Sequence, residues 1–342
     1  MPTTDPAPPG LDLVRLGTWF AQILGAGDRL QASLVAGGKS NLTYVVSDGE
    51  QEWIVRRPPL GHVLATAHDM SREYRVMTAL RDTAVPVPTT YAMCQDDSVV
   101  GAPFYVMERC VGTPYRKAAE LGPLGAGRTR TVSTRLVDTL TALHQVDPAA
   151  VGLGDFGRAE GFLHRQVNRW KKQLDASYVR DLPEADELYQ RLSADIPVES
   201  ATGIVHGDFR LDNLLVDAQD RVTAVLDWEM ATLGDPLADL AMLLVYHRLA
   251  KTAGGSLVAD ASTARGFLSE TEVIGRYAAG SDRDLSRFGF YLGLAAFKLA
   301  AILEGIHYRY LQGQTVGGGF DNIGEAIHPL LAAGLSALKE QG

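Results

Sequence analysis

The sequence has few cysteines and no long uninterrupted hydrophobic run. Its two cysteines, Cys94 and Cys110, lack the spacing of a metal or redox site. We interpret them as small apolar core residues, which suits a reducing environment, and we expect a cytoplasmic protein. The longest apolar stretches, 237–246 and 293–302, are short or broken by charge. Because about 20 apolar residues are needed to span a bilayer, no membrane partner is expected.

An excess of positive charge is also lacking. The 342 residues include 32 Lys and Arg against 41 Asp and Glu, a net charge of −9. Phosphate backbones select basic surfaces, so nucleic acid is not the expected partner. The first ten residues carry four prolines and no apolar segment, which predicts a flexible tail over 1–10 and no secretory signal. The remaining composition, 46% hydrophobic and 21% charged, is typical of a globular protein of one or two domains.

A glycine-rich stretch, LVAGGKSNLTYVV, lies at residues 34–46. It is not a Walker loop, which needs Gly six positions before its Lys and a helix after its Ser or Thr. Ser33 stands six positions before Lys39, and the residues after Ser40 favour a strand. The stretch therefore predicts a strand–turn–strand hairpin of the kind that covers nucleotide phosphates in protein kinases.

Hydrophobic periodicity predicts different structure in the two parts of the chain. In the first part we expect helices over 11–24 and 68–80 and five antiparallel strands over 29–36, 42–47, 53–57, 89–94 and 103–108. In the second part we expect helices over 131–144, 161–174, 183–192, 236–249, 262–279, 283–311 and 323–338, with short strands over 203–205, 214–217 and 222–226. The predicted fold class is α+β, with a β-rich N-lobe (11–110), a mostly helical C-lobe (111–342) and a ligand cleft between them.

The most informative stretches are GIVHGDFRLDNLLVD (203–217) and VTAVLDWEMATLGDPLADLAML (222–243). Two apolar strands frame a polar turn that carries Asp208 and, five residues on, Asn213. A third strand delivers Asp227 at its end, which could bring it beside Asn213. One carboxylate can then face a nucleophile, while the other two side chains give Mg²⁺ the oxygen ligands it prefers.

The pattern H-G-D-x-x-x-x-N with a later D-W-E resembles the aminoglycoside phosphotransferase family of kinase-like small-molecule enzymes. The stretches GGKSNLTYVV, WIVRRPP, LDWEMATLGDPLADLA and FKLAAILEGIHYRYLQGQ are similar to the branch that includes kinase-like domains fused to acyl-CoA dehydrogenases. The resemblance runs from about residue 28 to 315 and implies a two-lobed protein-kinase-like fold. It implies that Asp208 is the catalytic base, that Asn213 and Asp227 hold Mg²⁺, and that Arg210 touches the γ-phosphate of ATP.

The same resemblance implies supporting and nucleotide-binding residues. His206 and Asp239 would brace the catalytic turn through hydrogen bonds. The β- and γ-phosphates of ATP would lie under the glycine turn, at Gly37, Gly38, Ser40 and Asn41. Adenine would meet the backbone of the connector that includes Glu108 and Cys110.

One position departs from the kinase pattern. Arg56, in the third strand, stands where kinases carry Lys. With period-two alternation it shares a face with Ile54, whereas Arg57 points the other way. We expect Arg56 to pair with Glu73 on the following helix and to grip phosphate with its forked guanidinium.

These features predict an ATP- and Mg²⁺-dependent enzyme that phosphorylates a hydroxyl of a small molecule, a hydroxyacyl-CoA or a hydroxy acid. The sequence leaves open an aminoglycoside acceptor, a kinase-like binding module without catalysis, the choice of ATP or GTP, and a homodimer. A protein kinase is disfavoured, because D-W-E replaces D-F-G and no activation segment follows. Polar residues at helical spacing are candidates to line the acceptor pocket, with ordinary helix polarity as the alternative: Lys298, Glu304, His307, Tyr308 and Arg309.

Overall fold

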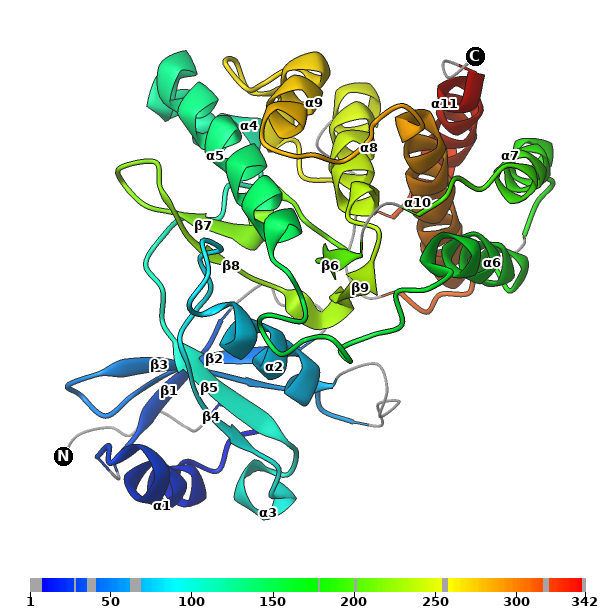
Figure 1. Ribbon diagram of the computed structural model, residues 1–342. Coiled ribbons are helices and arrows are strands. Elements are labelled where there is room, and N and C mark those ends of the chain that lie inside the picture. The colour runs from blue at the N-terminus through cyan, green and yellow to red at the C-terminus, as the bar shows by residue number, and fades with distance from the viewer. Residues whose placement is uncertain are drawn as a thin grey trace. The chain divides into compact units, whose positions relative to one another are not determined.

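The computed structural model describes residues 8–27, 29–35, 41–61, 69–177, 179–199, 202–253, 258–315 and 320–339. The chain divides into two compact units (Figure 1). The N-terminal unit comprises the residues up to Val111 together with Thr223–Ala231, and the C-terminal unit comprises Gly112–Val222 and the chain from Thr232 onward. The segment 223–231, which the sequence places in the C-lobe, thus belongs to the N-terminal unit.

The N-terminal unit is built on a five-stranded antiparallel sheet (Figure 1). Its strands are β1 (Gln31–Leu34), β2 (Leu42–Ser47), β3 (Glu52–Arg57), β4 (Thr90–Cys94) and β5 (Phe104–Glu108), in the order β1-β2-β3-β5-β4. Side chains alternate between the two faces of β3, so that Val55 is buried on one face while Ile54 and Arg56 share the other. The register pairs Arg56 with Tyr105 of β5.

Three helices accompany this sheet: α1 (Leu13–Leu24), α2 (Met70–Leu80) and α3 (Asp97–Val100). Helix α1 begins after Asp12, whose carboxylate accepts two backbone N–H groups, and ends at Gly25 in a left-handed conformation. Its buried face packs into the core of the unit through Leu16 and Phe20. The ring of Phe20 meets that of Trp53 edge to face, with centroids 5.4 Å apart.

The C-terminal unit is mostly helical (Figure 1). Its helices are α4 (Ala118–Leu121), α5 (Gly125–Gln145), α6 (Phe162–Asp175), α7 (Pro183–Ala194), α8 (Leu237–Ala253), α9 (Glu270–Ala279), α10 (Phe288–Leu311) and α11 (Ile327–Lys339). Strands β6 (Gly203–Val205) and β9 (Thr232–Gly234) pair antiparallel, and β7 (Leu214–Val216) precedes β8 (Val222–Val225), most of which belongs to the N-terminal unit. The predicted α+β class and kinase-like arrangement are confirmed.

Helix α10 is the central helix of this unit and packs against α6, α7, α8 and α11. Within the part of the chain that the structure describes, it is the one helix long and apolar enough to cross a membrane. However, 78% of its apolar window is buried in the protein, as expected for the core helix of a large helical unit.

Several predicted boundaries differ from the observed ones. The helix predicted over 262–279 is wrong in its first half: a single turn forms at Ala261–Thr263, and α9 begins only at Glu270. Ser269 is the N-cap of α9. It forms a capping box with Glu272 that satisfies free N–H groups at the start of the helix, so α9 does not extend further toward the N-terminus. Helix α5 starts six residues earlier than predicted, and α3 and β9 were not predicted.

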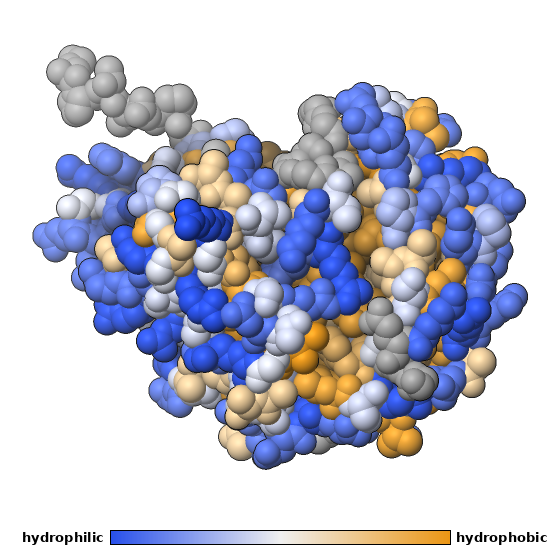
Figure 2. All heavy atoms as spheres, turned by 90° about the horizontal axis from the view of Figure 1, so that it is seen from above, coloured by the Kyte–Doolittle hydropathy of each residue, from blue (hydrophilic) through white to orange (hydrophobic). Residues whose placement is uncertain are grey.

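The face drawn in Figure 2 mixes hydrophilic and hydrophobic residues. Exposed hydrophobic residues show through between charged and polar ones on that face. Such mixing is the usual state of a protein surface and identifies no binding site by itself.

Replacing Phe20 tests the core of the N-terminal unit. We expect Phe20→Ala to lower the free energy of unfolding by about 3–5 kcal/mol, because it removes a fully buried ring and leaves a cavity. Guanidinium unfolding followed by tryptophan fluorescence would measure this, since Trp19 and Trp53 both contact the ring. The control is Val14→Ala on the same helix, where the side chain is 79% exposed and a change below about 0.5 kcal/mol is expected. Equal effects of the two variants would contradict the described core.

Candidate active site

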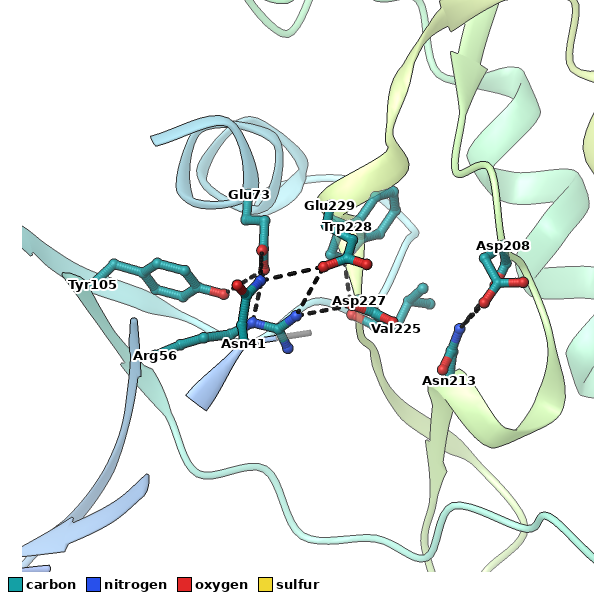
Figure 3. A network of polar contacts seen from close by, with 10 residues as sticks. All are labelled: Asn41, Arg56, Glu73, Tyr105, Asp208, Asn213, Val225, Asp227, Trp228 and Glu229. Atoms are coloured by element: carbon teal, nitrogen blue, oxygen red, sulfur yellow. Dashed lines mark hydrogen bonds and ion pairs between the residues drawn. The ribbon is translucent and has the colours of Figure 1, made fainter. Parts of the chain in front are cut away.

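A buried arginine organises the polar residues of the N-terminal unit (Figure 3). The guanidinium of Arg56 forms an ion pair with Glu73 of α2, with its Nε 3.1 Å from Oε2. Its Nη2 donates a hydrogen bond of 2.8 Å to Oδ1 of Asp227 and lies 3.9 Å from Oε2 of Glu229. The predicted pairing of Arg56 with Glu73 is therefore present. Arg57 points the other way, as expected, and donates to the carbonyl oxygens of Gly10 and Val100.

Glu73 is almost fully buried and accepts hydrogen bonds from two further side chains. The hydroxyl of Tyr105 donates to Oε2 at 2.9 Å, and Nδ2 of Asn41 donates to Oε1 at 3.0 Å. Burial raises the pKa of Glu73 to about 7, against the opposing effect of the Arg56 charge and the Tyr105 hydrogen bond. Burial also works against the charged form of Arg56, but the Tyr105, Glu73 and Asp227 groups raise its pKa overall.

Asn41 is the one predicted residue of the glycine flap that the structure describes. Gly37, Gly38 and Ser40 lie outside the described residues. The Asn41 side chain is buried and also donates to Oε2 of Glu229, at 3.2 Å. It therefore bridges the end of the flap to both α2 and the segment after Asp227, while its contact with phosphate stays a prediction.

Asp227 lies directly after β8 in a left-handed backbone conformation, with φ 68° and ψ 58°. Asp tolerates this region better than most residues, because its short polar side chain can bond locally. The indole N–H of Trp228 donates 2.9 Å to the carbonyl of Val225 and fixes the following turn. As a result, the carboxylates of Asp227 and Glu229 both reach the guanidinium of Arg56.

The predicted adenine connector has two of its backbone groups already engaged. The N–H of Glu108 donates to Thr89, and the carbonyl of Val111 accepts from the hydroxyl of Thr223. The side chain of Glu108 accepts the Thr89 N–H at 3.1 Å. Burial and the neighbouring Glu108 charge raise the pKa of Cys110 to about 12, so this cysteine stays a neutral thiol.

In the C-terminal unit, a buried carboxylate braces the turn that carries Asp208. Asp239 accepts the backbone N–H groups of His206 and Gly207 at 2.6 and 2.8 Å. His144 reaches Asp239 through Nε2 at 3.4 Å and contacts the hydroxyl of Tyr277 through Nδ1. Burial alone would raise the pKa of Asp239, but the His144 contact and the Gly207 N–H lower it below its usual value. The predicted brace is present, and His144 joins it without having been predicted.

Asp208 itself lies among polar side chains of the turn. The amide Nδ2 of Asn213 donates to the carbonyl oxygen of Asp208 at 2.8 Å and lies 3.3 Å from its Oδ2 (Figure 3). Arg210 places its Nε 3.3 Å from Oδ1 of Asp208 and its Nη2 3.1 Å from Asp212. The guanidinium of Arg210 also stacks on the ring of Tyr246, 4.6 Å from the centroid. The turn thus presents a carboxylate, an amide and a guanidinium together.

Lys298 of α10, which is 91 residues away in the chain, contacts the same turn. Its Nζ donates to the carbonyl of Gly207 at 2.9 Å and lies 5.5 Å from the centroid of Trp170. Burial lowers the pKa of this lysine, against the charges of Asp239 and Asp208. From the sequence, Lys298 is only a candidate to line the acceptor pocket, because no local sequence pattern predicts its contact with Gly207.

The predicted magnesium ligands offer oxygens of the right kind. Asp227 has a carboxylate, and Asn213 turns its amide nitrogen toward Asp208, which leaves its amide oxygen for a cation. Among the residues that the structure describes, no group of three or more His, Cys, Asp or Glu could hold a metal. Such a small set suits Mg²⁺, which keeps waters and takes substrate phosphates as further ligands. Asn213 and Asp227 belong to different units, so their joint role stays a prediction.

The raised pKa of Glu73 predicts a pH-dependent stability. The folded pKa, about 7, lies above the usual value of 4.5, so the folded state binds the proton more tightly than the unfolded state. The stabilisation is full below pH 4.5 and is lost as the pH rises through about 7, with a total of about 3 kcal/mol. We expect the unfolding free energy of the parent, relative to Glu73→Gln, to fall over this range in urea titrations. The exposed Glu50→Gln should change the unfolding free energy by less than about 0.5 kcal/mol, and a flat difference for Glu73→Gln would contradict the assignment.

Replacing Asp239 tests the brace. In Asp239→Asn an amide N–H₂ faces one of the two backbone donors, so we expect a loss of about 2–3 kcal/mol in unfolding free energy. The matched control is Asp284→Asn, where an exposed carboxylate accepts the N–H of Ser286 and a change within about 0.5 kcal/mol is expected. If both variants unfold at the same denaturant concentration as the parent, the hydrogen bonds to Asp239 do not stabilise the folded protein.

Solved structures show the same fold. A crystal structure from Ralstonia eutropha, provisionally described as an aminoglycoside phosphotransferase, is 33% identical with a TM-score of 0.85, over 96% of this chain and 98% of that one. Aminoglycoside phosphotransferase APH(4)-Ia, in ternary complex with AMP-PNP and hygromycin B, has a TM-score of 0.61 over 96% of this chain and 98% of its own. That likeness, at 15% identity, concerns the fold alone.

Curated relatives are much longer proteins. Acyl-CoA dehydrogenase family member 10 of Mus musculus is 37% identical over 283 residues, which are 81% of this chain and 26% of the relative. Human acyl-CoA dehydrogenase family member 11 is 34% identical over 88% of this chain and 39% of its own length. The chain thus spans about a quarter to two fifths of these relatives. The profile of the phosphotransferase enzyme family matches residues 31–278, and the chain belongs to this family.

Proposed function

We propose that this protein is an ATP- and Mg²⁺-dependent O-phosphotransferase that phosphorylates a hydroxyl of a small molecule, with hydroxyacyl-CoA thioesters or hydroxy acids as the acceptor class. Membership of the phosphotransferase family supports the general reaction. The solved relative with AMP-PNP supports an adenine nucleotide as donor.

The observation that carries the proposal is the braced turn of the C-terminal unit. Asp239 and Lys298 hold the backbone of Gly207 from two directions, through its N–H and its carbonyl. Asp208 follows directly and faces Asn213 and Arg210. A carboxylate held this firmly can accept a proton without first reorganising, which is what general base catalysis requires.

The chemistry needs few groups. The acceptor oxygen attacks the γ-phosphorus while its proton passes to a carboxylate oxygen of Asp208. The new O–P bond forms as the bond to the β-phosphate oxygen breaks, and ADP leaves with the negative charge. Arg210, whose guanidinium lies between Asp208 and Asp212, is the nearby cation that would balance charge on the transferred group.

The N-terminal unit would hold the nucleotide. Arg56 already binds Glu73 and Asp227, and its remaining donors suit phosphate oxygens. Asp227 and Asn213 would hold Mg²⁺, which when bound neutralises charge on the phosphates. Glu229 and Asn41 would keep Arg56 and Asp227 in place.

The acceptor class rests on the curated relatives. They are named acyl-CoA dehydrogenases, and this chain matches only a part of each. A phosphotransferase joined to such an enzyme would act on a related acyl compound, which must carry a hydroxyl to receive the phosphoryl group. Aminoglycosides are the second candidate, because two solved structures of the same fold hold hygromycin B and kanamycin.

The test is incubation with Mg·ATP and a panel of hydroxyacyl-CoAs, hydroxy acids and aminoglycosides, with mass spectrometry to detect a gain of phosphate. We expect phosphorylation of a hydroxyacyl compound, and a turnover about 10²- to 10⁴-fold lower in Asp208→Asn. The control variant is Asp282→Asn, an exposed carboxylate of the same unit, which should retain the parent turnover.

Each other outcome decides against a part of the proposal. If only aminoglycosides gain phosphate, they replace the hydroxyacyl compounds as the acceptor class. Turnover of Asp208→Asn within about threefold of the parent would remove Asp208 as the base. If no compound gains phosphate and calorimetry detects no binding of millimolar Mg·ATP, the protein is a non-catalytic module.

A further inference from the structure

A second polar cluster lies in the C-terminal unit, outside the braced turn. Glu304 of α10 is completely buried in an otherwise apolar stretch of the helix. Nη2 of Arg180 donates to its Oε2 at 2.8 Å and to the carbonyl of Gly324 at 3.0 Å. A Cβ on Gly324 would lie 3.0 Å from the ring of His307 and 3.2 Å from the guanidinium of Arg180, so these two side chains converge there.

Each of the three side chains has a buried atom without a hydrogen-bond partner among the described residues. These atoms are Oε1 of Glu304, Nε of Arg180 and Nδ1 of His307. Arg180 and Glu304 are therefore joined by one hydrogen bond, although a guanidinium and a carboxylate can form a bidentate pair with two. Leaving a buried polar atom unsatisfied costs free energy, so such a group in a native protein needs an explanation.

The cluster is chemically selective. Nε–H of Arg180 offers a donor, Oε1 of Glu304 an acceptor, and Nδ1 of His307 either role according to its tautomer. The charges of Arg180 and Glu304 already balance each other. A neutral group that both donates and accepts a hydrogen bond fits these atoms, whereas a phosphate, carboxylate or ammonium would bring an uncompensated charge.

Helix α10 connects the cluster to the braced turn. Lys298, which contacts Gly207, precedes Glu304 by six residues, a rise of about 9 Å along the axis. His307 follows after three more residues. The cluster therefore lies further along the same helix from the residue that contacts the turn before Asp208. The side chain of Arg180 is 29% exposed, so the cluster borders solvent rather than lying sealed in the core.

We propose that Arg180, Glu304 and His307 form a subsite for the far end of the acceptor, and that this subsite binds a secondary amide or a hydroxyl. This inference rests on the proposed phosphotransferase function. A hydroxyacyl-CoA presents such a group, since the pantetheine arm beyond its thioester carries secondary amides. The subsite would select thioesters by the arm while Asp208 acts on the acyl hydroxyl.

Three hydroxybutyryl thioesters test the proposal by calorimetry without nucleotide: those of N-acetylcysteamine (amide), 2-mercaptoethanol (hydroxyl) and ethanethiol (neither group). We expect the parent to bind the amide or the hydroxyl thioester at least about tenfold more tightly than the ethyl one, the usual worth of a charge-assisted hydrogen bond. Arg180→Lys keeps the charge but removes Nε–H, so it should abolish most of that preference and leave the ethyl thioester unchanged. Arg265→Lys, a change at an exposed arginine of the same unit, should alter none of the three affinities.

Equal affinity of the parent for all three thioesters would overturn the subsite. No binding of any of the three would also overturn it. If Arg180→Lys does not fold, the preference of the parent alone decides. The two proposals fail separately: binding of the amide thioester without phosphorylation would refute the proposed function, whereas equal phosphorylation of all three would refute the subsite.

Discussion

The guanidinium of Arg56 contacts three carboxylates of the N-terminal unit, those of Glu73, Asp227 and Glu229. Burial is the main cause of the raised pKa of Glu73, and the charges of Asp227 and Glu229 raise it further, against the Arg56 charge. Asn41 and Tyr105 contribute neutral hydrogen bonds that hold the carboxylates without adding charge.

The forked side chain explains why Arg stands at position 56 instead of the kinase Lys. Arg56 engages Glu73 through Nε and Asp227 through Nη2, two atoms that a lysine does not provide. The arrangement ties α2, β3 and the segment after β8 into one unit through one side chain. In the C-terminal unit Asp239 has a comparable role, because its buried carboxylate accepts the two consecutive backbone N–H groups that precede Asp208.

Much of the fold follows from local sequence. The five strands follow from period-two alternation of apolar residues, and the sequence also places the turn-forming pairs Asp48-Gly49 and Pro58-Pro59 on either side of the third strand. The pairing of Arg56 with Glu73 followed from the face that alternation gives Arg56. The roles of Tyr105, Glu229, His144 and Lys298 could not be predicted in this way. Tyr105 meets Glu73 only through the register of β3 and β5, and Lys298 reaches Gly207 across 91 residues of chain.

The left-handed backbone of Asp227 has a consequence for comparing variants at that position. Asn and Gly adopt a φ of 68° readily, whereas Ala, Glu or a β-branched residue there stores backbone strain. An alanine at 227 would therefore mix the loss of the carboxylate with a reshaped turn, and the reach of Glu229 would change with it. Asn is the replacement that isolates the charge, so the geometry of the main chain decides which substitution can report on the side chain.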